Sequence, residues 1–290
     1  MPAIKTTNPL VVHTQNELHV LEHKHPIAAV FTMGALHEGH ARLMDEARTY
    51  ADHSGNKAGT VIVTVFVNPT QFNDPDDFAN YPNTLDSDFE VCAKSDVDVL
   101  FVPQVSEIYP DEKVLAERIS AGSLGNILEG AARPGHFDAV LTVVYRLIQI
   151  TKPDVLFFGE KDFQQLVLVR QMVKALDLPV VVIGVPTVRD INGLALSSRN
   201  KKLTVASLKV ASRLYQALTL AQQGISEGKA PADIEVECVA YLQAIAEIEL
   251  DYFEILNEDL QTPKPNEKLR ALVAARIGGV RLIDNISLNR

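Results

Sequence analysis

Runs of apolar residues, many of them β-branched or aromatic, recur along the first part of the chain and predict strands. The runs stand at 27–33, 60–67, 97–102, 154–159 and 180–185. Nearly every position in them is apolar, whereas a half-exposed strand would alternate apolar and polar residues. This pattern is typical of strands covered on both faces, as in a parallel sheet.

Segments with the apolar period of a helix separate these runs. They lie at 39–53, 84–95, 136–150 and 161–176. In the third segment an amphipathic stripe is formed by Val140, Val143, Val144, Leu147 and Ile148. Strands that alternate with helices predict an α/β fold with a Rossmann-like, doubly wound parallel sheet.

The pattern changes after Pro186. Two long helical stretches, at 204–224 and 231–248, precede short strand-like runs at 251–256, 271–277 and 280–288. Gly278 and Gly279 supply a hairpin turn between the last two runs. We therefore expect two domains, residues 1–184 with the parallel sheet and residues 185–290 as a smaller α+β domain.

Composition and charge narrow the class of protein. The 290 residues are 47% hydrophobic and include 37 acidic against 27 basic side chains, for a formal net charge of -10. Because proteins bind nucleic acids largely by neutralising phosphates with positive charge, this balance disfavours a nucleic-acid partner. A small anionic substrate in a locally cationic pocket is compatible with it.

Hydropathy and cysteine usage both favour a soluble protein of the cytoplasm. The longest apolar runs, such as 61–67, fall far short of the roughly 18 residues of a membrane span, and the first residues lack the apolar core of a signal peptide. Cys92 and Cys238 stand far apart without a CxxC pattern, so we expect two buried thiols in a reducing compartment. No membrane partner is predicted.

Half of the eight histidines stand close together near the N-terminus, which raises the question of a metal site. They are His13, His19, His23 and His25. Because only His19 and His23 would share a face of a helix, we interpret the group as solvated surface residues.

The segment 31–47, FTMGALHEGHARLMDEA, carries the strongest local signal. The strand is expected to stop at Met33, Gly34 allows a sharp turn, and a helix starts at about Gly39. In an α/β sheet this junction of strand and helix is a common position for a ligand.

His37 and His40 bracket the start of that helix. A helix N-terminus offers backbone N–H groups and the positive end of a dipole, so it attracts phosphate, and two imidazole donors would add hydrogen bonds. Gly39 would let a nucleotide approach the backbone. The alternative is that the glycines only form the turn and the histidines are surface residues. A zinc-binding HExxH site is excluded, because His37 and His40 are three positions apart instead of four.

Two further segments follow predicted strands. After the second strand comes NPTQF at 68–72, where the neutral amides Asn68 and Gln71 suit hydroxyl and carboxylate groups. After the fourth comes GEKDFQQ at 159–165, in which Lys161 offers a point charge for phosphates. The Asn-Pro pair could equally be an ordinary turn.

A fourth segment lies beside the expected domain boundary, within LALSSRNKKL at 194–203. Ser197, Ser198 and Arg199 combine two hydroxyl donors with a guanidinium, a good donor set for phosphate oxygens. The alternative is a solvated linker that ends in a helix N-cap.

Taken together, these segments resemble one known family. Their order along the chain is MGALHEGH (33–40), VFVNPTQF (65–72), RPGHF (133–137), FFGEKDFQQ (157–165) and LSSRN (196–200). The combination is similar to the pantothenate synthetases, nucleotidyltransferases that share HIGH and KMSKS-type signatures with class I aminoacyl-tRNA synthetases. The resemblance spans residues 10–290.

The resemblance implies an ATP-dependent ligase that joins pantoate and β-alanine. The pantoate carboxylate attacks the α-phosphate of ATP to give pantoyl adenylate and pyrophosphate, and the β-alanine amine then displaces AMP. No enzyme nucleophile is needed. The resemblance also implies Mg2+ bridging phosphate oxygens and a homodimer formed through the N-terminal domain. No metal-binding residue is assigned, and the protein ligands of Mg2+, if any, stay open.

By the same resemblance, His37, His40 and Lys161 are catalytic, with His40 as the proton donor. The residues expected to bind ATP are Met33, Gly34, Ala35, Leu36, His37, Glu38, Gly39, His40, Gly159, Glu160, Lys161, Asp162, Val188, Leu196, Ser197, Ser198 and Arg199. Gly159, Asp162 and Val188 would hold the ribose and adenine. Gln71 and Gln165 would bind pantoate, with Asn68 nearby.

The sequence leaves three points open. Arg133 and His136 either form a polar Pro-Gly turn or belong to the rim of the site or a dimer interface. A related nucleotidyltransferase that stops at a nucleotidylated product is one alternative function. A noncatalytic nucleotide sensor or tRNA-binding relative is another.

Overall fold

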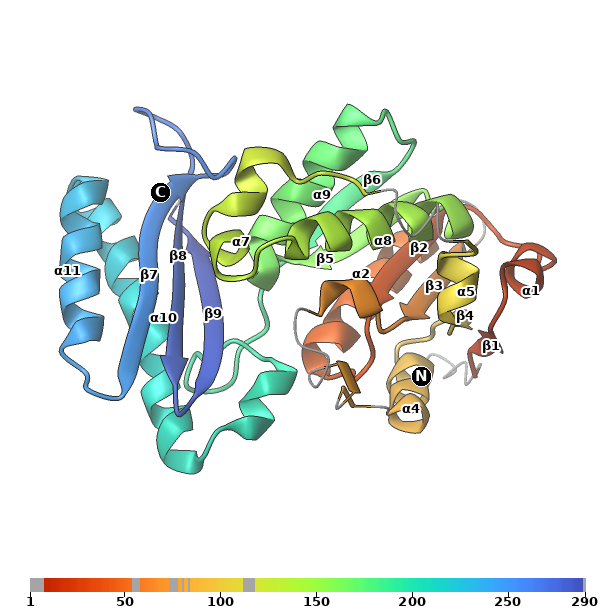
Figure 1. Cartoon of the computed structure of the whole chain (residues 1–290), viewed down its shortest axis with the longest axis horizontal. Helices are drawn as coiled ribbons and strands as arrows, with labels where there is room; N and C mark the ends of the chain where they lie inside the picture. The colour runs from red at the N-terminus through yellow and green to blue at the C-terminus, as the bar shows by residue number, and fades with distance from the viewer. Residues whose placement is uncertain are drawn as a thin grey trace. The chain divides into compact units, whose positions relative to one another are not determined.

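The computed structural model describes residues 8–53, 58–72, 78–79, 81–82, 84–111 and 118–288. They form two compact units, each built around its own sheet (Figure 1). The first unit takes Met1–Gly159 with Leu168–Val185, and the second takes Glu160–Val167 with Pro186–Arg290. In this division the short segment Glu160–Val167 groups with the C-terminal residues.

The first unit holds a six-stranded sheet in the order β1-β4-β3-β2-β5-β6. The strands are β1 Leu10–Val12, β2 Ile27–Thr32, β3 Thr60–Val65, β4 Val99–Phe101, β5 Val155–Gly159 and β6 Val181–Val185. Every neighbouring pair is parallel. The expected parallel sheet is therefore confirmed, with one addition. β1 has three residues at the sheet edge, too few to form a recognisable apolar run.

Helices cover both faces of this sheet (Figure 1). The α-helices are α1 Gln15–His19, α2 Glu38–His53, α4 Leu85–Lys94, α5 Val105–Ile108, α7 Glu129–Ala132, α8 His136–Thr151 and α9 Phe163–Ala175. Among the short 3-10 helices, η1 Pro69–Gln71 and η2 Gly122–Asn126 belong to the first unit, and η3 Glu160–Asp162 and η4 Ser198–Lys202 belong to the second. Met44 and Ala47 of α2 share one buried cluster with Val30 of β2 and Cys92 of α4. α8 lies on the opposite face and is buried along most of its length.

The second unit holds an antiparallel sheet in the order β7-β8-β9, made of Ile248–Asn257, Leu269–Ile277 and Val280–Ser287. Two helices, α10 Val205–Ser226 and α11 Pro231–Gln243, share a core with one face of this sheet. The expected α+β architecture is confirmed. α11 ends before 248, where the helix was expected to stop, because Ile248 pairs with Ile277 as the start of β7.

Gly278 and Gly279 form the expected turn between β8 and β9. Their φ angles are 57° and 76°, and a two-residue hairpin turn of type I′ requires a positive φ at both positions. The turn fixes the register in which Arg270 pairs with Ser287 and Leu272 with Asn285.

Both cysteines are buried and neither forms a disulfide, as expected. Burial raises the pKa of the Cys92 thiol to about 12 and that of the Cys238 thiol to about 11. Neither cysteine is therefore a thiolate near neutral pH, which is consistent with a structural role. Within the described ranges, no helix is long and apolar enough to cross a membrane.

The N-terminal histidines lie at the surface as expected, with His13, His19 and His25 exposed and His23 half-buried, and their rings also contact other parts of the chain. A ring nitrogen of His13 lies 3.0 Å from the Val102 oxygen, and one of His19 lies 2.8 Å from the Ile150 oxygen. His25 pairs with Asp154 at 2.6 Å. α1 ends at His19, so His19 and His23 do not share a helix. Among the described residues no group of three potential ligands is placed to hold a metal ion.

Candidate active site

The order of the parallel sheet reverses between β2 and β5. These strands are neighbours, with Ala28 opposite Val155 and Ala29 opposite Leu156. The chain runs outward from β2 to β3 on one side and from β5 to β6 on the other. In such sheets the crevice beyond the carboxyl ends of the two central strands is the usual ligand position. The segment 33–40 follows β2 there, and Gly159 ends β5.

A buried carboxylate shapes the loop after β2. Asp88 of α4 is 1% exposed and accepts hydrogen bonds from the backbone N–H of Ala35 at 3.1 Å and of Leu36 at 2.8 Å. Gly34 and Ala35 have positive φ angles of 86° and 53°. A Cβ atom at Gly34 would lie 2.9 Å from Asp88 Oδ2, so glycine is required there. The sequence does not distinguish Asp88, because acidic residues are common in the first turn of a helix, where they compensate the helix dipole.

His37 and His40 stand at the start of α2, as expected, with their ring centroids 4.2 Å apart. The backbone N–H of Gly39 donates to His37 Nδ1 at 3.1 Å, and the N–H of His37 donates to His40 Nδ1 at 3.3 Å. Because Nδ1 accepts in both rings, each neutral imidazole carries its proton on Nε2. The pair therefore presents two N–H donors from the first turn of a helix, a donor set suited to phosphate oxygens.

Gly39 leaves space for the ring of His37. A Cβ atom there would lie 2.9 Å from His37 Cε1 and 3.0 Å from His37 Nδ1. The open space therefore admits the His37 ring, and the glycine acts by letting this side chain fold over the helix start.

Asn68 and Gln71 differ sharply in their surroundings. Asn68 is fully buried: its Oδ1 accepts from Tyr109 Oη at 3.1 Å and from the Thr70 hydroxyl at 3.0 Å, and its Nδ2 donates to Ala139 O at 3.4 Å. Gln71 is 8% exposed, and its carboxamide forms no hydrogen bond within the described residues. Asn68 therefore anchors η1, whereas Gln71 has a carboxamide available for a ligand.

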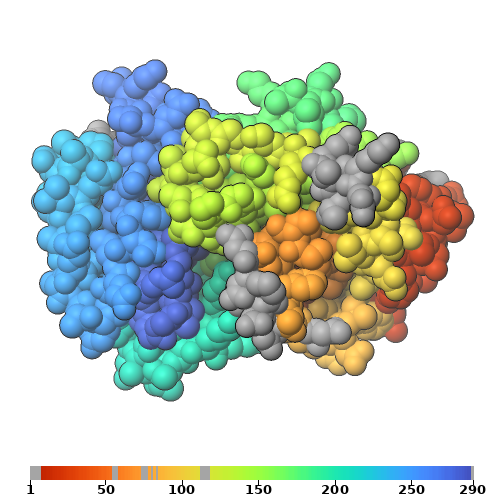
Figure 2. Space-filling model, in the orientation of Figure 1, coloured from red at the N-terminus to blue at the C-terminus, as the bar shows by residue number. Residues whose placement is uncertain are grey.

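Arg133 and His136 hold the backbone at Gln71. His136 Nδ1 and Arg133 Nη2 each lie 3.4 Å from the Gln71 carbonyl oxygen, and Arg133 Nη1 donates to His136 Nε2 at 2.9 Å. Figure 2 shows the orange segment that ends in η1 against the yellow-green segment leading into α8. The pair thus positions a predicted pantoate-binding residue, a role that the sequence did not reveal.

In the second unit, η3 places Lys161 directly after the end of β5. The Lys161 side chain is 17% exposed, and its Nζ lies 3.6 Å from Asp162 Oδ2. Glu160 Oε2 lies 3.3 Å from Arg270 Nη1 of β8. Two carbonyl oxygens of this segment accept hydrogen bonds from Asn285 of β9.

A hairpin brings Val188 next to Leu196. The Leu196 N–H donates to the Val188 oxygen at 2.9 Å, and Arg189 forms an isolated antiparallel bridge with Ala195. Ser197 follows directly and caps η4, since its Oγ accepts from the Arg199 N–H at 3.2 Å. The last turn of η4 also carries Arg199, Lys201 and Lys202.

The predicted site residues form two sets, one in each unit. The first unit contains Met33, Gly34, Ala35, Leu36, His37, Glu38, Gly39, His40, Asn68, Gln71 and Gly159. The second contains Glu160, Lys161, Asp162, Gln165, Val188, Leu196, Ser197, Ser198 and Arg199. Within each unit, segments far apart in the sequence are joined by hydrogen bonds, which places each set in an organised local structure.

One known family matches almost the whole chain. A family model described as pantoate-beta-alanine ligase matches residues 4–287. The chain belongs to this family. The family and the enzyme class expected from the sequence motifs, a ligase of pantoate and β-alanine, are confirmed.

Individual relatives support the same assignment. The pantothenate synthetase of Acidothermus cellulolyticus is 44% identical over 294 residues, covering 98% of this chain and 93% of the relative. The crystal structure of pantothenate synthetase from Thermus thermophilus superposes with a TM-score of 0.88 at 39% identity, covering 97% and 100%. The pantoate-beta-alanine ligase of Francisella tularensis, crystallised with beta-gamma ATP and beta-alanine, gives a TM-score of 0.76 at 38% identity, covering 97% and 98%.

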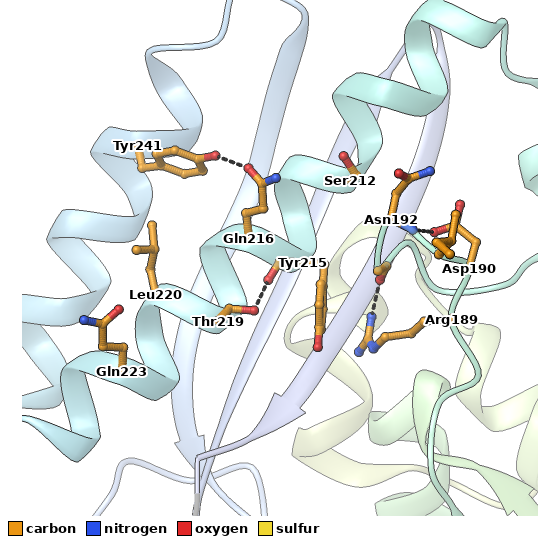
Figure 3. A pocket seen from close by; sticks show the side chains of 12 residues that line it. Arg189, Asp190, Asn192, Ser212, Tyr215, Gln216, Thr219, Leu220, Gln223 and Tyr241 are labelled. Atoms are coloured by element: carbon orange, nitrogen blue, oxygen red, sulfur yellow. Dashed lines mark hydrogen bonds between the residues drawn. The ribbon is translucent and has the colours of Figure 1, made fainter.

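The second unit contains a pocket of about 820 Å³ (Figure 3). It lies over α10 beside the loop 189–193 and includes Tyr241 of α11. Its polar groups bond to one another: the Tyr241 hydroxyl donates to Gln216 at 2.8 Å, and Arg189 donates to Gly193 O at 3.0 Å. Arg189, which follows Val188 in the sequence, lines this pocket, but none of the predicted site residues does.

Proposed function

We propose that the chain ligates pantoate and β-alanine through a pantoyl-adenylate intermediate, with ATP converted to AMP and pyrophosphate. The observation that carries this proposal is the pair of Nε2 donors, His37 and His40, at the start of α2 beyond the carboxyl end of β2. The related ligase from Francisella tularensis was crystallised with beta-gamma ATP and beta-alanine, which agrees with this chemistry.

The first step needs donors at the phosphates. A pantoate carboxylate oxygen bonds to the α-phosphorus of ATP, and the bond to the bridging oxygen of pyrophosphate breaks. The two Nε2–H groups of His37 and His40 would stabilise the negative charge on the phosphate oxygens, with His40 as the proton donor. Donors fixed before the reaction act most effectively on the transition state, because no reorganisation is needed.

The second step depends more on positioning the two reactants than on general acid–base catalysis. The β-alanine amine bonds to the acyl carbon of the adenylate, the acyl–oxygen bond to AMP breaks, and the amine loses a proton. Holding two reactants in the correct geometry can supply a large part of such a rate enhancement. No enzyme nucleophile takes part.

The second unit supplies the remaining groups for ATP in this proposal. Lys161, Ser197, Ser198 and Arg199 bind the triphosphate, and Gly159, Asp162 and Val188 hold the ribose and adenine. The hydrogen bond between Leu196 N–H and the Val188 oxygen supports this grouping, because it joins a nucleoside-binding segment to a phosphate-binding one.

Gln71 and Gln165 bind pantoate in this proposal, and Asn68 acts by holding η1. A neutral amide orients a carboxylate without the tight ion pairing that would lower its nucleophilicity. Gln71→Arg should therefore bind pantoate more tightly but turn over more slowly. An unchanged turnover together with tighter pantoate binding would contradict this role of the neutral amide.

Mg2+ enters the proposal as part of the MgATP substrate, held by phosphate oxygens. The proposed binding groups fit that arrangement, since imidazole N–H, ammonium, guanidinium and hydroxyl groups are donors for phosphate oxygens. We also propose a homodimer and a cytoplasmic location, as the family resemblance implies. Light scattering coupled to gel filtration tests the dimer.

The decisive experiment measures AMP formation from ATP with each acid alone and with both. AMP that appears only when pantoate and β-alanine are both present supports the ligase. Exchange of pyrophosphate into ATP with neither acid would contradict it, and ATP binding without turnover would favour a nucleotide sensor. A nucleotidylated product that accumulates in the presence of both acids would favour the related nucleotidyltransferases.

A further inference from the structure

Two neighbouring residues of β9, Asp284 and Asn285, are buried polar groups that the proposed reaction does not use directly. Each is 4% exposed. Because successive side chains of a strand point to opposite faces of the sheet, the two side chains reach different neighbours. A buried polar group costs free energy unless it is hydrogen-bonded, so its partners indicate what it does.

Asn285 holds the backbone of η3. Its Nδ2 donates to the carbonyl oxygen of Glu160 at 2.8 Å and to that of Lys161 at 2.9 Å. Its Oδ1 accepts from Arg270 Nη1 at 2.7 Å. The orientation of the carboxamide is therefore determined, with the oxygen toward the guanidinium and both N–H groups toward the segment that carries Lys161.

Arg270 fixes the same segment from a second direction. It is 5% exposed, and its guanidinium carbon lies 3.7 Å from the centre of the Phe163 ring. The guanidinium also lies 3.3 Å from the carboxylates of Glu160 and Glu258. Since Glu160 begins η3 and Phe163 directly follows it, the arginine that orients Asn285 also contacts both ends of the turn.

Asp284 holds the second ATP-binding segment. Its carboxylate accepts from both terminal nitrogens of Arg189, at 2.9 Å for Nη2 to Oδ1, and Nη2 also donates to the backbone oxygen of Asn285 at 3.0 Å. Such a two-point contact between guanidinium and carboxylate restricts orientation as well as distance. Arg189 directly follows Val188 in the hairpin that leads to the phosphate-binding segment 196–199.

We propose that Asp284 and Asn285 are positioning residues of the ligation reaction, which set the spacing between η3 and the 188–196 hairpin from adjacent positions of one strand. The inference rests on the proposed phosphate-binding role of Lys161. Neither side chain touches a substrate in this scheme. Asn285 acts through the backbone that carries Lys161, and Asp284 acts through Arg189.

Asn285→Asp tests the first half with a nearly isosteric change. One carboxylate oxygen can still accept from Arg270, but the other would face the carbonyl oxygens of Glu160 and Lys161 and repel them. We expect kcat for pantoate-dependent pyrophosphate exchange to fall roughly 10- to 100-fold, the scale of a small misplacement of a reacting group. KM for pantoate should change less than about 2-fold, since the Asn285 side chain bonds to Arg270 and to the backbone of η3 and not to the proposed pantoate-binding residues Gln71 and Gln165.

Asn266→Asp is the matched control. Asn266 is exposed in the loop between β7 and β8, so the same chemical change there should leave the kinetics at wild-type values. Thermal unfolding monitored by circular dichroism checks that both variants fold. If Asn285→Asp does not fold, Asn285→Ala removes the two donors without introducing the repulsion and carries the same kinetic expectation.

A double variant that combines Asn285→Asp with Lys161→Ala tests the role of Asn285 separately from the proposed role of Lys161. If Asn285 acts through Lys161, Asn285→Asp should add less than about 3-fold to the loss caused by Lys161→Ala. A full additional loss, or a wild-type rate for folded Asn285→Asp while Lys161→Ala is impaired, would overturn the inference alone. A wild-type rate for Lys161→Ala would overturn the proposed role of Lys161 and the inference with it.

Asp284→Asn tests the second half. The new NH2 group would face the Arg189 guanidinium, weaken its hold on the hairpin and raise KM for ATP about 3-fold or more while KM for pantoate stays constant. An unchanged KM for ATP in the folded variant would overturn the role of Asp284.

Discussion

At the residue scale, the proposed chemistry depends on a few donors whose orientation the backbone determines. In His37 and His40 the Nδ1 atoms accept backbone N–H groups, so that Nε2 is the donor in each neutral ring. Their location at the first turn of α2 adds the helix dipole to the attraction for phosphate. The catalytic assignment of these residues therefore has a structural basis that single substitutions can test.

His40→Ala and Lys161→Ala should each lower turnover by roughly 10²-fold or more, the scale of losing one transition-state donor. The measurement is the rate of AMP formation with both acids at saturation. His53→Ala is the matched control for His40, because His53 is exposed at the end of the same helix and its ring contacts only the Thr49 oxygen in that helix. A near-wild-type rate in a folded variant would remove that residue from the mechanism.

Asp88→Asn should slow the reaction without removing any group that touches a substrate. The carboxylate accepts from two backbone N–H groups of the loop after β2, and an amide NH2 in place of one oxygen would face a donor. We expect the free energy of unfolding to fall by roughly 1–3 kcal/mol, the range for lost hydrogen bonds to a charged group.

Urea unfolding and steady-state kinetics of Asp88→Asn measure the two effects. Asp86→Asn, in the first turn of the same helix but exposed, is the control and should change the free energy of unfolding by no more than about 0.5 kcal/mol. Equal stability and equal turnover of the two variants would show that Asp88 does not shape the loop.

At the element scale, the strands and turns that the sequence predicts are those with a recognisable pattern among neighbouring residues. The parallel strands were predicted because they are apolar on both faces, and the β8–β9 turn because two glycines tolerate positive φ. β1 was missed because three edge residues give no pattern, and the end of α11 was misplaced because strand pairing decided it.

The parts of the site that the sequence did not predict depend on partners that are distant in the chain. Asp88 bonds to a residue 52 positions away, and Asn285 to one 125 positions away. An isolated Asp in a helix or Asn in a strand has no local feature that distinguishes it from a surface residue. The motif residues were recognisable in sequence, whereas the residues that hold the motifs became visible only with tertiary contacts.

The 188–196 hairpin offers an element-scale prediction through Gly193. Its φ is 85°, and a Cβ atom there would come within about 2.0 Å of the Tyr215 ring, which also stacks on Arg189. Gly193→Ala should therefore displace the hairpin, raise KM for ATP and lower the free energy of unfolding by roughly 1–3 kcal/mol.

Gly279→Ala is the control for Gly193→Ala, because it introduces backbone strain without a steric clash. Gly279 has a φ of 76°, but no atom lies within 4 Å of the position that a Cβ would take, so alanine there meets only the backbone strain. Gly193→Ala should be the less stable variant in thermal unfolding, and KM for ATP should rise for it alone. Equal destabilisation, with no effect on ATP, would mean that the hairpin is not part of the ATP site.

At the scale of the whole molecule, one helix contributes residues to both units. α9 begins in the second unit with Phe163 and continues in the first from Leu168. Each unit also contains one buried cysteine, Cys92 in the first and Cys238 in the second. The two thiols therefore report separately on the unfolding of two units that share a continuous helix.

We expect both thiols to become reactive over the same urea range, because unfolding one unit removes packing from half of α9. At pH 8 in the absence of urea neither should be labelled by a thiol reagent, since burial raises the pKa of Cys92 to about 12 and that of Cys238 to about 11. Mass spectrometry of each cysteine-containing peptide follows the two sites in one experiment. Labelling of Cys92 and Cys238 in clearly separated urea ranges would show that the units unfold independently.

The buried Cys92 thiol makes the free energy of unfolding depend on pH. Folding raises the pKa of Cys92 from 9.0 to about 12, so this group leaves the free energy of unfolding unchanged below pH 9 and lowers it as the pH rises from 9 toward 12, where only the unfolded thiol ionises. Cys92→Ala should weaken that decrease when urea unfolding of the variant and the wild type is compared from about pH 8 to about pH 11. An identical slope in the two proteins would mean that the Cys92 thiol is as accessible in the folded chain as in the unfolded one.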